Sequence, residues 1–78
     1  MATKSQVQKL AKSQGATFYE GYESSGYIAE VLLPNHLVWD GMEGGACTQC
    51  KSDKETWSSF WAEMLRYIDR DVIPNPYW

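Results

Sequence analysis

Two cysteines and a single histidine are the side chains in this sequence best suited to chemistry. Cys47 and Cys50 form a Cys-x-x-Cys motif, and His36 precedes them. Thiol–disulfide enzymes place this motif at the start of a helix, where the thiol pKa is lowered. Here the helix pattern starts later, at Ser52, and residues 46–51 read as extended, so the two thiols would point to opposite faces. The motif therefore does not predict thiol redox catalysis.

Zinc is the alternative chemistry for the same side chains. Cys47, Cys50 and His36 carry thiolate and imidazole groups, which are the ligands that zinc prefers. A carboxylate could supply the fourth ligand, and the candidates are Asp40, Glu43 and Asp53. A structural zinc site usually has two close pairs of ligands, whereas this sequence has one. A small zinc-stabilised domain therefore stays open as an alternative, and no other cofactor is predicted.

Nothing else in the sequence makes a catalytic set. Nucleophilic catalysis needs a base within hydrogen-bond reach of the nucleophile, and no such partner is placed near His36 by spacing. Gly41, Gly44 and Gly45 are followed neither by a Gly-Lys-Ser/Thr motif nor directly by a helix, so they do not form a phosphate-binding loop. We therefore expect a protein that is not an enzyme.

The first positioning element is an N-terminal helix within residues 1–15. Thr3 is followed three residues later by Gln6, which is the spacing of a capping box. Gly15 suits the position just past the helix end. The side chains at i, i+3, i+4 and i+7 spacing are Val7, Leu10, Ala11 and Gln14. This narrow apolar stripe predicts an amphipathic helix with a lysine-rich outer side.

Residues 16–51 read as antiparallel strands and loops. The runs 16–22 and 27–33 are rich in aromatic and branched residues and are separated by a Ser-Ser-Gly turn, which predicts a hairpin. The second run has bulky side chains on both faces and should lie centrally in the sheet. Pro34 ends it, residues 36–39 form a short extended piece, and residues 46–51 read as a last strand.

The second predicted helix, residues 52–73, carries the strongest pattern. Ser52 and Glu55 have the spacing of a capping box, and Pro74 would stop the helix. The apolar face comprises Trp57, Phe60, Trp61, Met64, Leu65, Ile68 and Val72. Such a continuous stripe is expected to pack across the sheet, with residues 74–78 as an extended tail.

These elements predict one α+β domain, residues 1–78, in the order αβββα. A small antiparallel sheet of three strands, or four if residues 36–39 join it, would be packed by the N-terminal and C-terminal helices. A chain of 78 residues buries roughly 60% of the surface that its unfolded form exposes. Four tryptophans, five tyrosines and two phenylalanines supply the bulk that such a core needs.

The charge and hydropathy of the sequence limit the classes of partner that it can have. The net charge is −3, and residues 20–78 hold ten acidic against four basic side chains, a balance of −6. An acidic body disfavours nucleic acid as a partner and favours a protein. The start of the chain lacks an apolar signal segment, and no apolar run is long enough to cross a bilayer. We therefore expect a cytoplasmic protein, with no membrane contact and with reduced cysteines.

The helix–strands–helix order is similar to that of the double-stranded-RNA-binding domain. That family docks through lysines at the start of its last helix. In this sequence Lys51 and Lys54 stand at that place, offset by Asp53 and Glu55. A module of this kind remains a further alternative.

The aromatic residues exceed what a core this small can bury. Tyrosine and tryptophan are frequent in interface hot spots, and nearby carboxylates would add charge complementarity. The predicted partner-binding residues are Tyr19, Tyr22, Trp39, Asp40, Glu43, Tyr77 and Trp78. An edge strand or the aromatic tail could also pair two copies into a homodimer.

The whole layout resembles short uncharacterised proteins of bacteriophages and prophages. The likeness lies in the lysine-rich start at residues 4–12, the aromatic hairpin, the turn from Pro34 to Trp39, the glycine-rich turn and the last helix near residues 57–68. Where such proteins often carry a histidine after the glycine turn, this one has Cys47. The resemblance implies no settled activity. The acidic body, the surplus aromatics and the absence of a catalytic set instead lead us to expect a small non-enzymatic protein-binding module, a phage accessory protein that binds or inhibits a host or phage protein.

Overall fold

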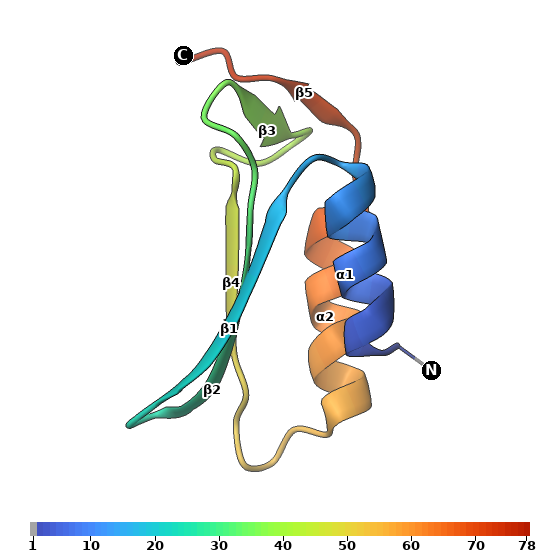
Figure 1. Ribbon diagram of the computed structural model, residues 1–78, viewed down its shortest axis with the longest axis vertical. Helices are drawn as coiled ribbons and strands as arrows, with labels where there is room; N and C mark the ends of the chain where they lie inside the picture. Colours follow the sequence, from blue (N-terminus) through green and yellow to red (C-terminus); the bar gives the residue numbers. More distant parts are fainter. Residues whose placement is uncertain (1) are drawn as a thin grey trace.

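The protein is built of two layers, a three-stranded sheet and a pair of helices, with a small two-stranded ribbon at one end. The computed structural model describes residues 2–78. In chain order the elements are α1 (Lys4–Ser13), β1 (Thr17–Glu23), β2 (Gly26–Leu32), β3 (Leu37–Trp39), β4 (Ala46–Cys50), α2 (Trp57–Ile68) and β5 (Val72–Pro74). Both helices lie against the same face of the sheet (Figure 1). The predicted α+β class and its two terminal helices are confirmed.

Helix α1 begins and ends as the local sequence predicts. The Thr3 hydroxyl accepts a hydrogen bond from the Gln6 backbone N–H, and the Gln6 side chain accepts one from the Thr3 N–H, which completes the capping box. Gly15 follows the helix with a φ of 74°, a conformation that costs glycine nothing. Val7 and Ala11 are the buried residues of α1.

The sheet has the strand order β1-β2-β4, so β2 is central as predicted. Both pairings are antiparallel, with Ala29 opposite Glu20 on one side and opposite Gln49 on the other. Because side chains alternate along a strand, Tyr27, Ala29 and Val31 face the helices and are buried. Ile28, Glu30 and Leu32 point to the opposite face.

Helix α2 is shorter at its start than the sequence predicts. The predicted cap at Ser52 is wrong: Thr56 is the N-cap, and its hydroxyl accepts a hydrogen bond from the Ser59 backbone N–H at 3.1 Å. Ser52 instead closes a turn, in which its carbonyl oxygen accepts from the Glu55 N–H at 3.2 Å. Two residues of capping type lie close together here, and Thr56 caps the turn from which Phe60 and Trp61 reach the core.

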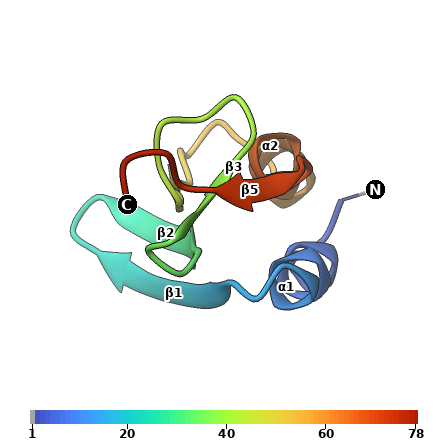
Figure 2. The ribbon, with the colours of Figure 1, turned by 90° about the horizontal axis from the view of Figure 1, so that it is seen from above.

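The end of α2 also differs from the prediction. The helix ends at Ile68 with Asp69 as its cap, and Val72–Pro74 forms β5 instead of a last helical turn and a free tail. Strand β5 pairs antiparallel with β3, the extended piece that was the candidate fourth strand. Figure 2 shows this ribbon crossing the end of the molecule. The pairing gives backbone N–H and C=O groups of β3 hydrogen-bond partners in β5. If α2 continued through residues 72–74, β3 would lose these partners.

Trp39 is the last residue of β3 and its side chain is part of the core, so the expectation that it is a surface aromatic is wrong. Its side chain is 0% exposed. The indole Nε1–H donates to Oε1 of Gln14 at 3.2 Å, and Nε2 of Gln14 donates to the Ile68 carbonyl oxygen at 2.7 Å. One glutamine therefore joins the ends of both helices to Trp39, which satisfies the polar atom that a buried indole brings.

Candidate functional site: an uncovered sheet face and an aromatic cleft

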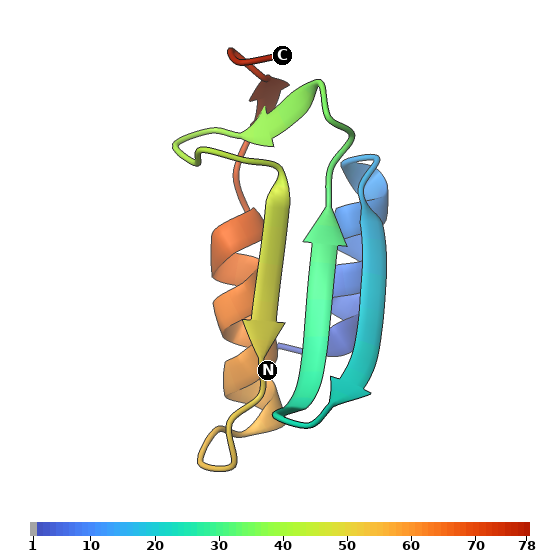
Figure 3. The same cartoon turned by 90° about the vertical axis from the view of Figure 1, so that its left-hand side faces the viewer.

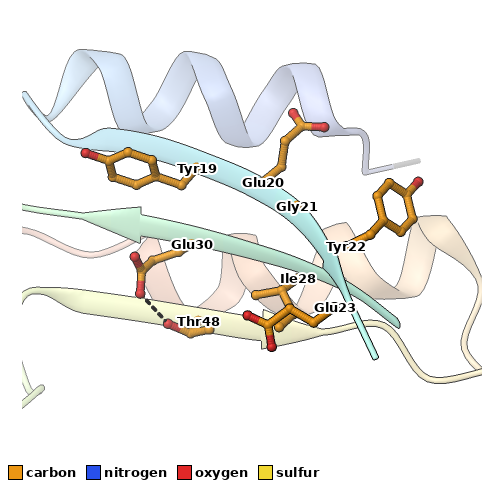
Figure 4. A pocket seen from close by; sticks show the side chains of 8 residues that line it. All are labelled: Tyr19, Glu20, Gly21, Tyr22, Glu23, Ile28, Glu30 and Thr48. Carbon is orange, nitrogen blue, oxygen red and sulfur yellow. Dashed lines mark hydrogen bonds between the residues drawn. The ribbon is translucent and has the colours of Figure 1, made fainter. Parts of the chain in front are cut away.

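One face of the sheet carries no helix within residues 2–78 (Figure 3), and side chains of this face line a hollow. The hollow has a volume of about 390 Å³. It extends over all three strands, and its lining comprises Tyr19, Glu20, Gly21, Tyr22, Glu23, Ile28, Glu30 and Thr48 (Figure 4). We call this region the acidic face. It lies on the molecular surface, so its side chains are available to a partner.

The acidic face combines negative charge with aromatic and aliphatic surface. The carboxylates of Glu23 and Glu30 point out on this face, whereas Glu20 lines the hollow from the strand edge and turns its carboxylate toward α1. No lysine or arginine lines the hollow within the described part of the chain. Tyr19 is 54% exposed and Ile28 is half-buried. Oε2 of Glu30 accepts a hydrogen bond from the Thr48 hydroxyl at 2.8 Å, which orients that carboxylate across the β2–β4 pairing.

A second hollow, which we call the aromatic cleft, lies where β1 and β2 meet the starts of the two helices. Its volume is about 260 Å³. The lining residues are Lys4, Glu20, Tyr22, Tyr27, Trp57 and Trp61. Trp57 and Trp61 are stacked with an interplanar angle of 18°, and the Tyr27 ring meets Trp57 edge-on at 5.1 Å between centroids. Four aromatic rings from three elements therefore line one cleft.

Tyr27 contributes an unusual polar atom to this cleft. Its side chain is only 5% exposed, and its hydroxyl is buried without a hydrogen-bond partner in residues 2–78. Burial, with the nearby negative charge of Glu20 and the Tyr22 phenol, raises the pKa of Tyr27 to about 12. The phenol therefore stays protonated and neutral at physiological pH. A buried polar atom without a partner costs about 1–3 kcal/mol.

The acidic face and the aromatic cleft share Glu20 and Tyr22 on strand β1. Figure 4 shows Glu20 rising from β1 toward α1. There its carboxylate accepts from the Lys4 ammonium at 3.0 and 3.1 Å, and both side chains of this ion pair are partly exposed. Because β1 is the wall between the two hollows, a single ligand could reach both around this edge of the sheet.

The structure brings only some of the predicted partner-binding residues together. Tyr19 and Tyr22 line the acidic face, and Tyr22 is 80% exposed. Asp40 and Glu43 are exposed between β3 and β4, outside both hollows. Tyr77 and Trp78 are exposed near the C-terminus, at the end of the molecule away from the β1–β2 turn (Figure 1). Trp39 is buried and cannot present its ring to a partner.

The candidate zinc ligands lie on different surfaces. Cys47 is buried, Cys50 and His36 are exposed, and both cysteines are free thiols. Residues three apart in a strand point to opposite faces, so the two thiols of β4 diverge. Among residues 2–78 no group of three or more histidine, cysteine or acidic side chains is arranged to hold a metal ion. Burial raises the pKa of the Cys47 thiol to about 11.

The two lysines weighed for RNA binding precede α2 instead of opening it. Lys54 is exposed in the turn before the helix. Nζ of Lys51 donates to the Ser52 carbonyl oxygen at 2.9 Å and lies 5.3 Å from the centroid of the Trp57 ring. Lys51 is thus engaged within its own chain, in a cation–π contact.

The sequence reasoning missed several residues of these two hollows. Trp57 was assigned to the core, yet it is 49% exposed. Glu20, Glu23 and Glu30 are not among the predicted site residues. The alternation along the two hairpin strands nevertheless assigns each of them to a face of the sheet. That alternation places Glu30 and Ile28 on one face, which is a usable sign of a polar surface with an apolar centre.

Comparison with known proteins identifies no relative of this chain. No family model, no curated protein and no solved structure matches it. Within residues 2–78, no helix combines the length and the apolar character that crossing a membrane requires.

Proposed function

We propose that this protein is a non-enzymatic binding module that attaches to a positively charged protein surface through its acidic face. In keeping with the resemblance noted above, we propose an accessory role of the phage type, in which the module binds or inhibits a host or phage protein in the cytoplasm. The observation that carries the proposal is the uncovered sheet face, where Glu23 and Glu30 lie beside the Tyr19 and Ile28 side chains without a basic residue in the lining.

Charge complementarity supports a basic partner. A surface of one sign steers an oppositely charged protein during encounter and rejects like-charged ones. Glu20 is already paired with Lys4, whereas Glu23 and Glu30 have no ion-pair partner in residues 2–78. Those two carboxylates are therefore available to lysine or arginine side chains of another protein.

The apolar part of the face supports a protein partner rather than a small cation. Tyr19 is 54% and Leu32 is 38% exposed on the same face of the sheet, which also carries Ile28. Interfaces gain most of their free energy from such aromatic and aliphatic contacts at the centre of a polar rim. Free thiols at Cys47 and Cys50 suit the reducing cytoplasm in which we place the protein.

The test is a capture experiment with charge-matched baits. The full chain, the face variant Glu23→Lys/Glu30→Lys and the control variant Glu43→Lys/Asp53→Lys are immobilised and exposed to bacterial lysate at low and high salt. Both variants change the net charge equally, but only the first alters the acidic face. Circular dichroism confirms that each bait is folded.

We expect a basic protein to be retained by the wild-type and control baits, lost from the face variant and released as ionic strength rises. Equal loss of the protein from both variants would show that overall charge, and not this face, governs capture. Absence of any specific protein on the wild-type bait would contradict the proposed function itself.

A further inference from the structure

The aromatic cleft has three features that a core cavity does not need. It is open to solvent, it has a carboxylate at its rim, and it contains the buried Tyr27 hydroxyl without a partner. Native proteins satisfy most buried polar atoms, so such a group calls for an explanation. A ligand that donates a hydrogen bond to this hydroxyl would supply one.

We infer that the cleft is a binding site for the guanidinium group of an arginine side chain presented by the partner. This inference rests on the proposed function, because it names the side chain with which a basic partner would enter the cleft. The ring faces of Trp57, Trp61 and Tyr22 attract a cation, and Glu20 supplies the opposite charge.

Arginine fits this arrangement better than lysine. The cleft offers two acceptors of different kinds, the Glu20 carboxylate and the Tyr27 hydroxyl oxygen. A guanidinium is planar and has five N–H donors in a fixed fork, so it can donate to both while its plane stacks on an indole ring. An ammonium is a compact charge with no plane to stack.

Two lysine ammonium groups of the chain already lie close to the aromatic cleft or its rim. Nζ of Lys51 lies 5.3 Å from the centroid of the Trp57 ring, although Lys51 is outside the cleft lining. Nζ of Lys4 holds Glu20 at the cleft rim. This contact satisfies Glu20 but leaves the Tyr27 hydroxyl without a partner. Lys4 thus occupies part of the site, and an incoming guanidinium would replace it on Glu20.

Replacement of Lys4 costs little. Its ion pair with Glu20 is partly exposed, and exposed pairs contribute only about 0.2–1 kcal/mol. Lys4 is also the first residue of α1, where the positive helix terminus disfavours a cation. Removal of Lys4 should therefore strengthen arginine binding, which is the reverse of what loss of a merely structural ion pair would do.

The test uses Nα-acetyl-arginine amide and its neutral isostere Nα-acetyl-citrulline amide as probes of the full chain. Two-dimensional ¹H–¹⁵N spectra follow the four indole N–H signals. Saturable shifts are expected at Trp57 and Trp61 with the arginine probe and not with the citrulline probe. Trp39 and Trp78 serve as internal references, because neither lines the cleft.

Four variants sharpen the result. Lys4→Ala should raise the affinity for the arginine probe by up to about fivefold, the equivalent of an exposed ion pair. Glu20→Gln and Tyr27→Phe should each lower it, and Trp57→Leu should abolish saturable binding. Tyr77→Ala, at the other end of the molecule, should leave it unchanged. Preserved Trp39 signals report that each variant is folded.

Equal responses to arginine and citrulline, equal shifts at all four indoles, or no gain in affinity for Lys4→Ala would each overturn the inference. The face variant Glu23→Lys/Glu30→Lys separates it from the proposed function. That variant should still bind the arginine probe. If the wild-type chain binds the probe but captures no protein from lysate, the cleft stands and the proposed function fails. If a protein is captured but the probe does not bind, the reverse holds.

Discussion

Trp39 and Trp57 lie at opposite ends of the helix layer and have opposite environments. Trp39 is fully buried and donates a hydrogen bond to Gln14, which in turn reaches the end of α2. Trp57 is half exposed and contacts other aromatic rings. The β3–β5 ribbon accounts for the difference, because it crosses the Trp39 end and no corresponding ribbon crosses the other end within residues 2–78 (Figures 1 and 2).

The difference indicates that stability and binding are concentrated in separate places. At the closed end, the indole N–H of Trp39 is satisfied inside the chain and the Trp39 ring is covered. At the open end, rings cover one another incompletely and the Tyr27 hydroxyl lacks a partner. A ligand at the open end could cover the exposed rings and give the Tyr27 hydroxyl a hydrogen-bond partner. Each prediction below weighs one end against the other.

The largest effect is expected from truncating the two indoles in turn. Trp39→Ala should lower the free energy of unfolding by about 3–5 kcal/mol, because it empties a fully buried site. Trp57→Ala should lower it by only about 1 kcal/mol, because half of that side chain is already in water. Urea denaturation followed by far-ultraviolet circular dichroism measures both. Similar losses of unfolding free energy in the two variants would contradict the proposed difference between the two ends.

The next effect concerns the polar link at the closed end. Gln14→Ala removes the partner of the Trp39 indole N–H and one of two donors to the Ile68 carbonyl oxygen, which keeps the Arg70 N–H. Leaving the buried indole N–H unsatisfied should cost about 1–3 kcal/mol. Gln8→Ala, on the exposed side of α1, is the matched control and should change the urea midpoint little. A midpoint for Gln14→Ala as high as that of the control would show that the link contributes nothing.

A smaller effect tests the cap that positions Trp57 at the open end. Thr56→Ala removes the hydroxyl that accepts from the Ser59 N–H and should cost about 1 kcal/mol. Ser52→Ala should cost almost nothing, because in Ser52 the backbone carbonyl closes the turn and not the side chain. The two urea midpoints decide between the caps. If Ser52→Ala were the more damaging change, α2 would start at the earlier site.

The smallest effect is an alkaline loss of stability. Burial raises the pKa of Cys47 from 9.0 to about 11 and that of Tyr27 from 10.0 to about 12. Below pH 9 both groups are protonated whether the chain is folded or not. Above pH 9 the unfolded chain releases the Cys47 proton while the folded chain keeps it, so the free energy of unfolding falls until about pH 11. Tyr27 adds its own loss between about pH 10 and pH 12.

Urea midpoints between pH 7 and pH 9.5, with a reductant present, should reveal a loss of about 1 kcal/mol or less from Cys47. Cys47→Ala should flatten this part of the profile, although it lowers stability at every pH by removing a buried sulfur. Tyr27→Phe should leave the loss below pH 10 intact. A profile that keeps its slope in Cys47→Ala would mean that another group titrates there.

The sequence by itself determined the elements that depend on neighbouring residues. The Thr3–Gln6 capping box and Gly15 bound α1, and the bulky side chains on both faces of residues 27–33 predicted that this strand lies at the centre of the sheet. Caps, turns and side-chain period act over a few residues, so these features are readable before any tertiary contact exists. The exposure of Tyr19 and Tyr22 followed from composition, because a chain this small cannot bury all its aromatic rings.

Tertiary structure alone decided the end of α2, the cover over Trp39 and the open cleft at Trp57. Residues 72–74 have an apolar spacing that fits a helix, but they pair with residues 37–39, far away in the chain. That pairing ends α2 at Ile68 and buries Trp39. Local pattern cannot reveal which of two compatible states gains a distant strand partner, because the deciding hydrogen bonds and buried area come from the other end of the chain.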